Sequence, residues 1–98
     1  MRILGKLKLK DFWDNHPEAR TPLERWVKVV ENAQWNNWAD LKSTFRTADL
    51  VTGTRKRVVF NVGGNKYRLI AVVNYQGVLV IIEAALTHRQ YDADKWKG

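Results

Sequence analysis

The first part of the chain combines apolar residues at helical spacing with residues that end helices. A short apolar segment, residues 2–4, is typical of an edge strand. Apolar residues then recur at helical spacing over residues 6–15, which predicts a helix that ends where His16 meets Pro17. The apolar positions of this helix are Leu7, Leu9, Phe12 and Trp13.

A second helix is predicted to begin at Thr21. Thr21 is expected as its N-cap, Pro22 as its first residue and Glu24 as the partner that completes a capping box. The helix is expected to reach about residue 34, because its apolar residues form one stripe: Leu23, Trp26, Val27, Val30 and Ala33. Stacking on a nucleic-acid base is an alternative role for Trp26, but its place in the stripe favours the core.

Residues 35–54 lack a regular period and are interpreted as a connecting segment. Its expected anchors in the core are Trp38, Leu41, Phe45 and Leu50. A connection of this length is unusual within a compact domain and is often functional. A helical turn within it is the alternative that the sequence leaves open.

Beyond residue 56 the period of the apolar residues falls from about 3.6 to about 2, which indicates strands. Three strands are predicted, Arg57–Val62, Lys66–Tyr75 and Val78–Leu86, all rich in β-branched and aromatic residues. Gly63-Gly64 and Gln76-Gly77 are typical of the hairpin turns that would join them.

Side-chain alternation predicts a sheet with one apolar and one basic face. A Gly63-Gly64 turn pairs Asn61 with Lys66 and Val59 with Arg68. The residues of opposite parity are apolar and must meet the helices: Val58, Phe60, Val62, Tyr67, Leu69, Ala71 and Val73. The other face carries basic and amide side chains, with Arg55 just before the first strand: Arg57, Asn61, Lys66 and Arg68.

The last strand is expected to deliver the chain to the basic end of the sheet. A tight Gln76-Gly77 turn sets Glu83 opposite Ile70, and a turn two residues longer sets it opposite Arg68. In either register the chain leaves the sheet beside Lys66.

A C-terminal helix follows, because Thr87-His88-Arg89-Gln90 has the form of a capping box. It is expected to run through Tyr91 toward Trp96, with His88 and Tyr91 on one face. The predicted fold is therefore α+β. A short N-terminal strand and two helices pack on one face of a mainly antiparallel sheet, and a short C-terminal helix follows.

Composition adds a partner to this picture. The 98 residues, expected as a single domain over 1–98, hold 17 Lys and Arg against 10 Asp and Glu, a net charge of +7. This excess favours a nucleic acid over a membrane, since no basic helix has an obvious lipid-facing side. The chain has no cysteine, no apolar run of membrane-spanning length and no signal-peptide pattern, so the cytoplasm is the expected compartment.

The residues gathered beside Lys66 are those that metal-independent RNA cleavage requires. The ribose 2′-OH needs a base, the pentavalent phosphate needs cations, and the departing 5′-oxygen needs an acid. Histidine is the side chain suited to act as acid or base near neutral pH, which is the role expected of His88, and Lys66 and Arg68 supply charge. Tyr91 offers a proton or a stacking surface, and Glu83 is a second candidate base unless it forms a salt bridge.

Two segments, Val59–Ile70 and Thr87–Asp92, together resemble the HigB branch of the RelE-like toxins. The resemblance extends in length and element order over nearly the whole chain. It implies an mRNA interferase that usually acts on messenger RNA in the ribosome and is neutralised by a helix-turn-helix, HigA-like antitoxin. The family's functional positions fall on Lys66, Arg68, His88 and Tyr91.

We therefore expect a metal-independent endoribonuclease without a cofactor, in which Arg55, Arg57, Asn61 and Lys95 contact the RNA. A non-catalytic RNA- or DNA-binding module explains the charge equally well and is the alternative. A metal enzyme is disfavoured, because His16 and His88 lie far apart in the sequence and no cluster has ligand spacing.

Overall fold

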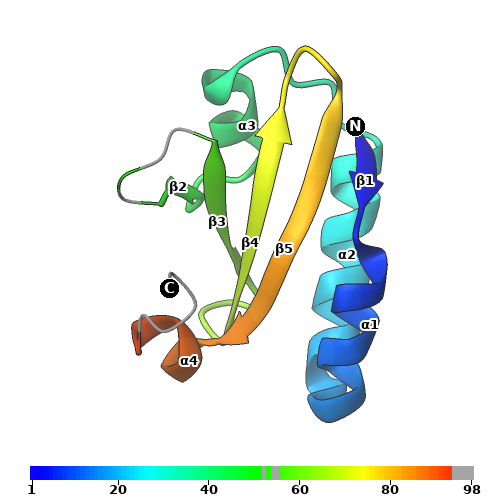
Figure 1. Ribbon diagram of the computed structural model, residues 1–98, viewed down its shortest axis with the longest axis vertical. Helices are drawn as coiled ribbons and strands as arrows, with labels where there is room; N and C mark the ends of the chain where they lie inside the picture. Colours follow the sequence, from blue (N-terminus) through cyan, green and yellow to red (C-terminus); the bar gives the residue numbers. More distant parts are fainter. Residues whose placement is uncertain (52, 54–55, 94–98) are drawn as a thin grey trace.

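The computed structural model describes residues 1–51, 53 and 56–93. Its sheet has the strand order β1-β5-β4-β3-β2, parallel between β1 and β5 and antiparallel elsewhere. Figure 1 shows α1 and α2 side by side on one side of the sheet, and α3 and α4 at its opposite ends. The elements are β1 (Arg2–Leu4), α1 (Lys6–Asn15), η1 (Pro17–Ala19), α2 (Arg20–Glu31), α3 (Trp38–Thr44), β2 (Asp49–Leu50), β3 (Arg57–Val62), β4 (Tyr67–Asn74), β5 (Leu79–Thr87) and α4 (His88–Asp92).

The main core lies between α1, α2 and the face of the sheet that was predicted to be apolar. The α+β class, the edge strand β1 and the bounds of α1 and β3 are confirmed, and β4 and β5 each begin one residue later than predicted. Trp26 is a core residue, 3% exposed. All seven sheet residues expected to face the helices belong to this core: Val58, Phe60, Val62, Tyr67, Leu69, Ala71 and Val73.

The start predicted for α2 is wrong. The helix begins at Arg20, because the 3-10 turn η1 leads into it directly and the chain is already helical at Thr21. The Ala19 N–H donates to the carbonyl of His16 at 2.8 Å, and no side chain caps the helix. Glu24 pairs with Arg20 one turn earlier instead of closing a capping box.

The C-terminal end predicted for α2 is also too late, since the helix ends at Glu31. The side chain of Asn32 turns back and donates to the carbonyl of Lys28 at 2.8 Å. The carbonyls of Val30 and Ala33 accept from the Met1 amine, at 3.1 and 2.8 Å, so the chain no longer follows the helical hydrogen-bond pattern.

The connecting segment contains α3 and the two-residue strand β2, so the helical alternative is confirmed. Leu41 of α3 is fully buried, and Trp38 and Phe45 pack against the main core. Leu50 is not an anchor, because it lies on the edge strand β2 and is 37% exposed. Val51, the next residue, is buried in its place.

The register between β3 and β4 is shifted by two residues from the prediction. Asn61 lies opposite Arg68, because the hairpin loop has four residues and not two. Gly63 and Gly64 both adopt positive φ, at 65° and 70°, where a glycine is unstrained. A shift of two preserves parity, so the two faces are as predicted, but Lys66 lies in the loop and not in the strand.

A β-bulge in β5 contradicts both registers considered for Glu83. Val80 lies opposite Val73, but the register changes between Ile70 and Ala71, and Ala84 lies opposite Ile70. Glu83 therefore has no partner residue in β4. The bulge also reverses the parity of the rest of the strand.

Because of this reversal, the sheet face away from α1 and α2 is less basic than predicted. A second apolar cluster lies on it, made of Val51, Val59 and Ile70 with Ala84, Leu86 and Tyr91 packed against them. Thr87 lies opposite Tyr67. The chain still leaves the sheet beside Lys66, since the His88 N–H donates to the Lys66 carbonyl at 3.0 Å.

Candidate functional site

The helix α4 is fixed to the end of the β4–β5 hairpin by the capping box that the sequence predicts. The Thr87 hydroxyl accepts from the Gln90 N–H at 3.1 Å, and the Thr87 N–H donates to the Gln90 side chain at 2.9 Å. The bond from the His88 N–H to the Lys66 carbonyl joins this helix start to the β3–β4 loop. The loop and α4 thus form one unit that holds the candidate residues.

Arg68 is the buried centre of this unit, only 8% exposed. Its guanidinium lies 5.7 Å from the centre of the Tyr91 ring, a cation–π arrangement. It donates to the Asn65 side chain at 2.7 Å and to the carbonyls of Asn65 and Tyr67 at 3.2 Å. Most of its donors therefore hold the loop and Tyr91 in place and are not directed to solvent.

His88 forms an ion pair that sequence reasoning missed. Its Nδ1 lies 2.8 Å from Oδ2 of Asp92, one turn further along α4, and 43% of the His88 side chain is exposed. A carboxylate on Nδ1 fixes the tautomer and orients the ring, which leaves Nε2 for proton transfer. The spacing of four residues on a predicted helix is the signal that could have identified Asp92.

Lys66 supplies the accessible charge of the site. It is exposed on the β3–β4 loop, and within the described residues its ammonium forms no ion pair. The loop therefore presents one free cation next to the start of α4. Together, Lys66, Arg68, His88 and Tyr91 meet at one end of the sheet, as the sequence predicts.

The other predicted residues do not join this group. Arg57 lies opposite Val72, four residues along β4 from Arg68, which corresponds to about 13 Å of strand. Its guanidinium binds both carboxylate oxygens of Glu83, at 2.7 and 3.2 Å, so the salt-bridge interpretation of Glu83 is confirmed.

Asn61 contributes to a different contact, because its side chain donates to the Thr47 carbonyl at 3.5 Å. A small pocket of about 240 Å³ opens between α2 and the β3–β4 loop, and both Asn61 and Arg25 line it. Arg25, exposed on α2, is a basic residue next to the loop that sequence reasoning did not select. Arg55 and Lys95 lie outside the described residues.

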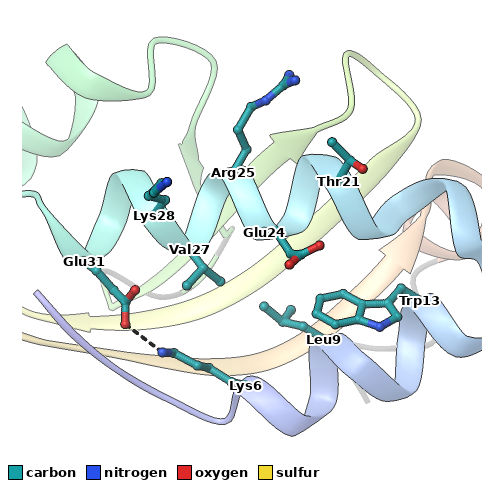
Figure 2. Close-up of a pocket in the computed structure, with 9 residues that line it drawn as sticks. All are labelled: Lys6, Leu9, Trp13, Thr21, Glu24, Arg25, Val27, Lys28 and Glu31. Atoms are coloured by element: carbon teal, nitrogen blue, oxygen red, sulfur yellow. Dashed lines mark hydrogen bonds and ion pairs between the residues drawn. The ribbon is translucent and has the colours of Figure 1, made fainter.

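A larger groove, of about 560 Å³, lies between α1 and α2 and contains none of the predicted site residues. Figure 2 shows Leu9 and Trp13 of α1 and Val27 of α2 directed into it. The Lys6–Glu31 ion pair, at 2.6 Å, crosses one end. The groove has an apolar floor and charged rims, formed by Lys6, Glu24, Arg25, Lys28 and Glu31, and no histidine lines it.

Comparison with known proteins relates the chain to toxins of one class. The family model of the HigB toxins, the RelE-like toxic component of a toxin–antitoxin system, matches residues 19–94. The mRNA interferase toxin HigB of Escherichia coli strain K12 is 29% identical over 92 residues, which cover 94% of this chain and 88% of that protein. The mRNA interferase HigB of Shigella flexneri gives the same values.

A more distant relative, the mRNA interferase HigB of Escherichia coli O6:H1, is 23% identical over 94% of this chain and 89% of its own length. The family match includes every described residue of the β3–β4 loop and of α4. None of the helices in the described part of the chain is long and apolar enough to cross a bilayer.

Proposed function

Because the chain belongs to the HigB family of RelE-like toxins, we propose that it is an mRNA interferase, an endoribonuclease that cuts messenger RNA and inhibits translation. The observation that carries this proposal is the unit formed by the β3–β4 loop and α4. It holds a histidine with a carboxylate partner, a tyrosine and a free lysine around one buried arginine.

The proposed reaction needs no metal. A base removes the proton of the ribose 2′-OH, the 2′-oxygen bonds to phosphorus, and the bond from phosphorus to the 5′-oxygen breaks. An acid gives a proton to that leaving oxygen, so the products are a 2′,3′-cyclic phosphate and a free 5′-OH. Proton transfer is the role of His88 in this scheme, with Asp92 orienting its ring through the 2.8 Å contact.

The cations stabilise the charge that develops on the phosphate. Lys66 is free to approach the non-bridging oxygens directly, and it acts in the scheme as the main electrostatic group. Arg68 adds positive potential and is a positioning residue, since its bonds to Asn65 and its contact with Tyr91 fix the loop and the helix. Tyr91 supplies a proton or a stacking surface.

The proposed substrate is messenger RNA held in the ribosome, and the proposed compartment is therefore the cytoplasm. As a toxic component, the chain has a cognate antitoxin. We propose that this antitoxin is a helix-turn-helix, HigA-like protein. A small reading frame of this type beside the gene, whose coexpression restores growth, is the expected finding; a stand-alone gene argues against it.

The decisive experiment is induced expression in bacteria with primer extension on several messages. Growth arrest with new message ends is expected. The same ends should form in vitro on ribosomes in magnesium buffer or on free RNA in EDTA, and the upstream fragments should carry a 2′,3′-cyclic phosphate. Arrest without new ends favours the non-catalytic RNA- or DNA-binding module. Cleavage of free RNA that EDTA abolishes, or upstream fragments that end in a 3′-hydroxyl, removes the metal-independent scheme.

A further inference from the structure

A pocket lies at the end of the sheet opposite α4. Its volume is about 630 Å³, and it is formed by the start of α3, the end of β4 and the β4–β5 turn. Figure 1 shows α3 and this turn together at one end of the molecule and α4 at the other. No residue of the proposed cleavage site lines it.

Two aromatic rings, those of Trp38 and Tyr75, form part of the pocket lining. Both are half-buried and pack against the main core, so each ring is held firmly on its inner side. Burial, together with the Asp40 carboxylate, raises the pKa of Tyr75 above its usual value of 10.0, so the hydroxyl stays neutral. That hydroxyl makes no hydrogen bond with another described residue and is available to a ligand.

Side-chain amides complete the polar part of the lining. Asn37 and Asn74 are engaged in local turns, accepting from the N–H groups of Asp40 at 2.9 Å and Gly77 at 2.8 Å. The amides of Asn36 and Gln76 are exposed and make no hydrogen bond within the described part of the chain. A free amide offers a donor and an acceptor together, the combination that base edges also present.

The charges around the pocket favour a polyanion. Lys56 lines it, and no carboxylate does. Lys42 lies 6.0 Å from the centre of the Trp38 ring, and Arg46 shares a shallow hollow with both residues on the outer side of α3. The Asp40 carboxylate, which acts on Tyr75, accepts from the Asn36 backbone N–H at 2.8 Å.

We propose that this pocket binds a base of single-stranded RNA, several nucleotides away from the bond that is cut. The inference rests on the proposed function for its substrate. Rings that stack on any base, amides that bind base edges and nearby cations are what single-strand recognition uses. Five residues of β4, from Tyr67 to Ala71, separate the Lys66 loop from the nearest lining residue, Val72, which corresponds to about 17 Å of strand. One RNA strand would therefore cross the open sheet face.

Binding of a 2′-O-methyl RNA of about twelve nucleotides tests this, because it lacks the attacking 2′-OH and is not cut in the proposed scheme. Trp38→Leu should weaken binding roughly fivefold or more, as expected for the loss of one stacked base, without changing the salt dependence. Gln76→Ala and Asn36→Ala, both exposed, should weaken it by a smaller factor. Gln34→Ala, exposed beyond the pocket, is the matched control and should bind like the parent.

Photocrosslinking to the parent protein reports RNA contact directly, so its result does not depend on the stability of any variant. An RNA with one 5-bromouridine, moved along the sequence, should crosslink to Trp38 or Tyr75 from positions near one end only. Crosslinks absent at every position, or parental affinity in Trp38→Leu, Asn36→Ala and Gln76→Ala alike, overturn the inference.

The two proposals fail in different ways. A parent that cuts messages while the pocket variants bind RNA normally leaves the function intact and removes the pocket. A parent that cuts nothing, with weakened RNA binding in the variants, keeps the pocket and removes the nuclease.

Discussion

The structure gives His88 a neighbour that the sequence analysis did not predict. The sequence places it at a helix start, and the fold adds Asp92 at 2.8 Å from its Nδ1. Thr87 and Gln90 cap the helix without it, so His88→Gln should change the free energy of unfolding by no more than about 0.5 kcal/mol. Cleavage should fall roughly 10²- to 10⁴-fold.

Single-turnover cleavage and thermal melting of the same preparations check this. Arg89→Gln, at the next exposed position of α4, is the matched control and should keep near-parental cleavage. Asp92→Asn should cut more slowly than the parent but faster than His88→Gln, since it removes only the group that orients the ring. Full cleavage by His88→Gln would move the base to another residue.

The role of Tyr91 is best tested with a substitution that keeps its aromatic ring. Its ring packs in the second apolar cluster and against Arg68, so Tyr91→Ala disturbs the fold as well as the chemistry. Tyr91→Phe keeps both contacts and removes only the hydroxyl. If Tyr91 donates a proton, Tyr91→Phe should cut roughly 10²-fold more slowly or worse at parental stability; normal cleavage would assign it a stacking role.

At this scale the sequence predicts which candidate residues lie together but not their environments. Capping by Thr87 and the shared face of His88 and Tyr91 depend only on local spacing, which the chain itself determines. The burial of Arg68 depends on the four-residue loop, whose two glycines fit equally well in a shorter turn. The contact of His88 with Asp92 depends on their spacing of four residues, which is one turn of α4.

Among the elements, the bulge in β5 determines the role of Glu83. It leaves Glu83 without a partner in β4 and directs the carboxylate to Arg57, with oxygens at 2.7 and 3.2 Å from the guanidinium. Both carboxylate oxygens are held by this contact, so the side chain is not placed to reach a ribose 2′-OH beside α4. Glu83→Gln should therefore cut within a few-fold of the parent, with a loss of stability of at most about 1 kcal/mol for a half-exposed pair.

The comparison with His88→Gln makes this prediction informative, because the two substitutions separate the two candidate bases. Cleavage assays at equal protein concentration, with melting temperatures for both variants, are sufficient. A loss of 10²-fold or more in Glu83→Gln at parental stability would make Glu83 the base.

The elements themselves illustrate what a periodic pattern can and cannot predict. The predicted register of β3 and β4 is wrong by two residues, but the two faces are predicted correctly, because side chains return to the same face at every second residue. The bulge reverses parity by one residue, and nothing in Val80–Leu86 signals it, because apart from Glu83 the run is apolar at both parities. The predicted start of α2 is wrong because Thr21-Pro22 has the pattern of a helix start, whereas α2 follows directly from the 3-10 turn that ends at the buried Ala19.

For the whole molecule, the open sheet face is the part that the sequence predicted least well. Helical spacing and strand parity place α1, α2 and one sheet face in a common core, because burying apolar area requires it. The other face was expected to be basic, but the bulge brings Ala84 and Leu86 onto it beside Ile70. Within the described part of the chain, Lys66 therefore presents its charge at the end of this face.

The net charge of +7 makes RNA binding depend on salt, and Lys66 should account for a definite share of that dependence. Each phosphate neutralised on a single strand releases condensed counterions and contributes a slope of about 0.7 in log Kd against log salt. Lys66 is exposed and forms no ion pair with the described residues, so Lys66→Ala should lower the slope by about this amount and weaken binding. Lys10→Ala is the matched control: it also removes one charge, but from an α1 lysine that already pairs with Asp14 at 3.0 Å. Because both variants carry the same net charge, equal slopes for the two would mean that the molecule's overall field, and not the loop, binds the RNA.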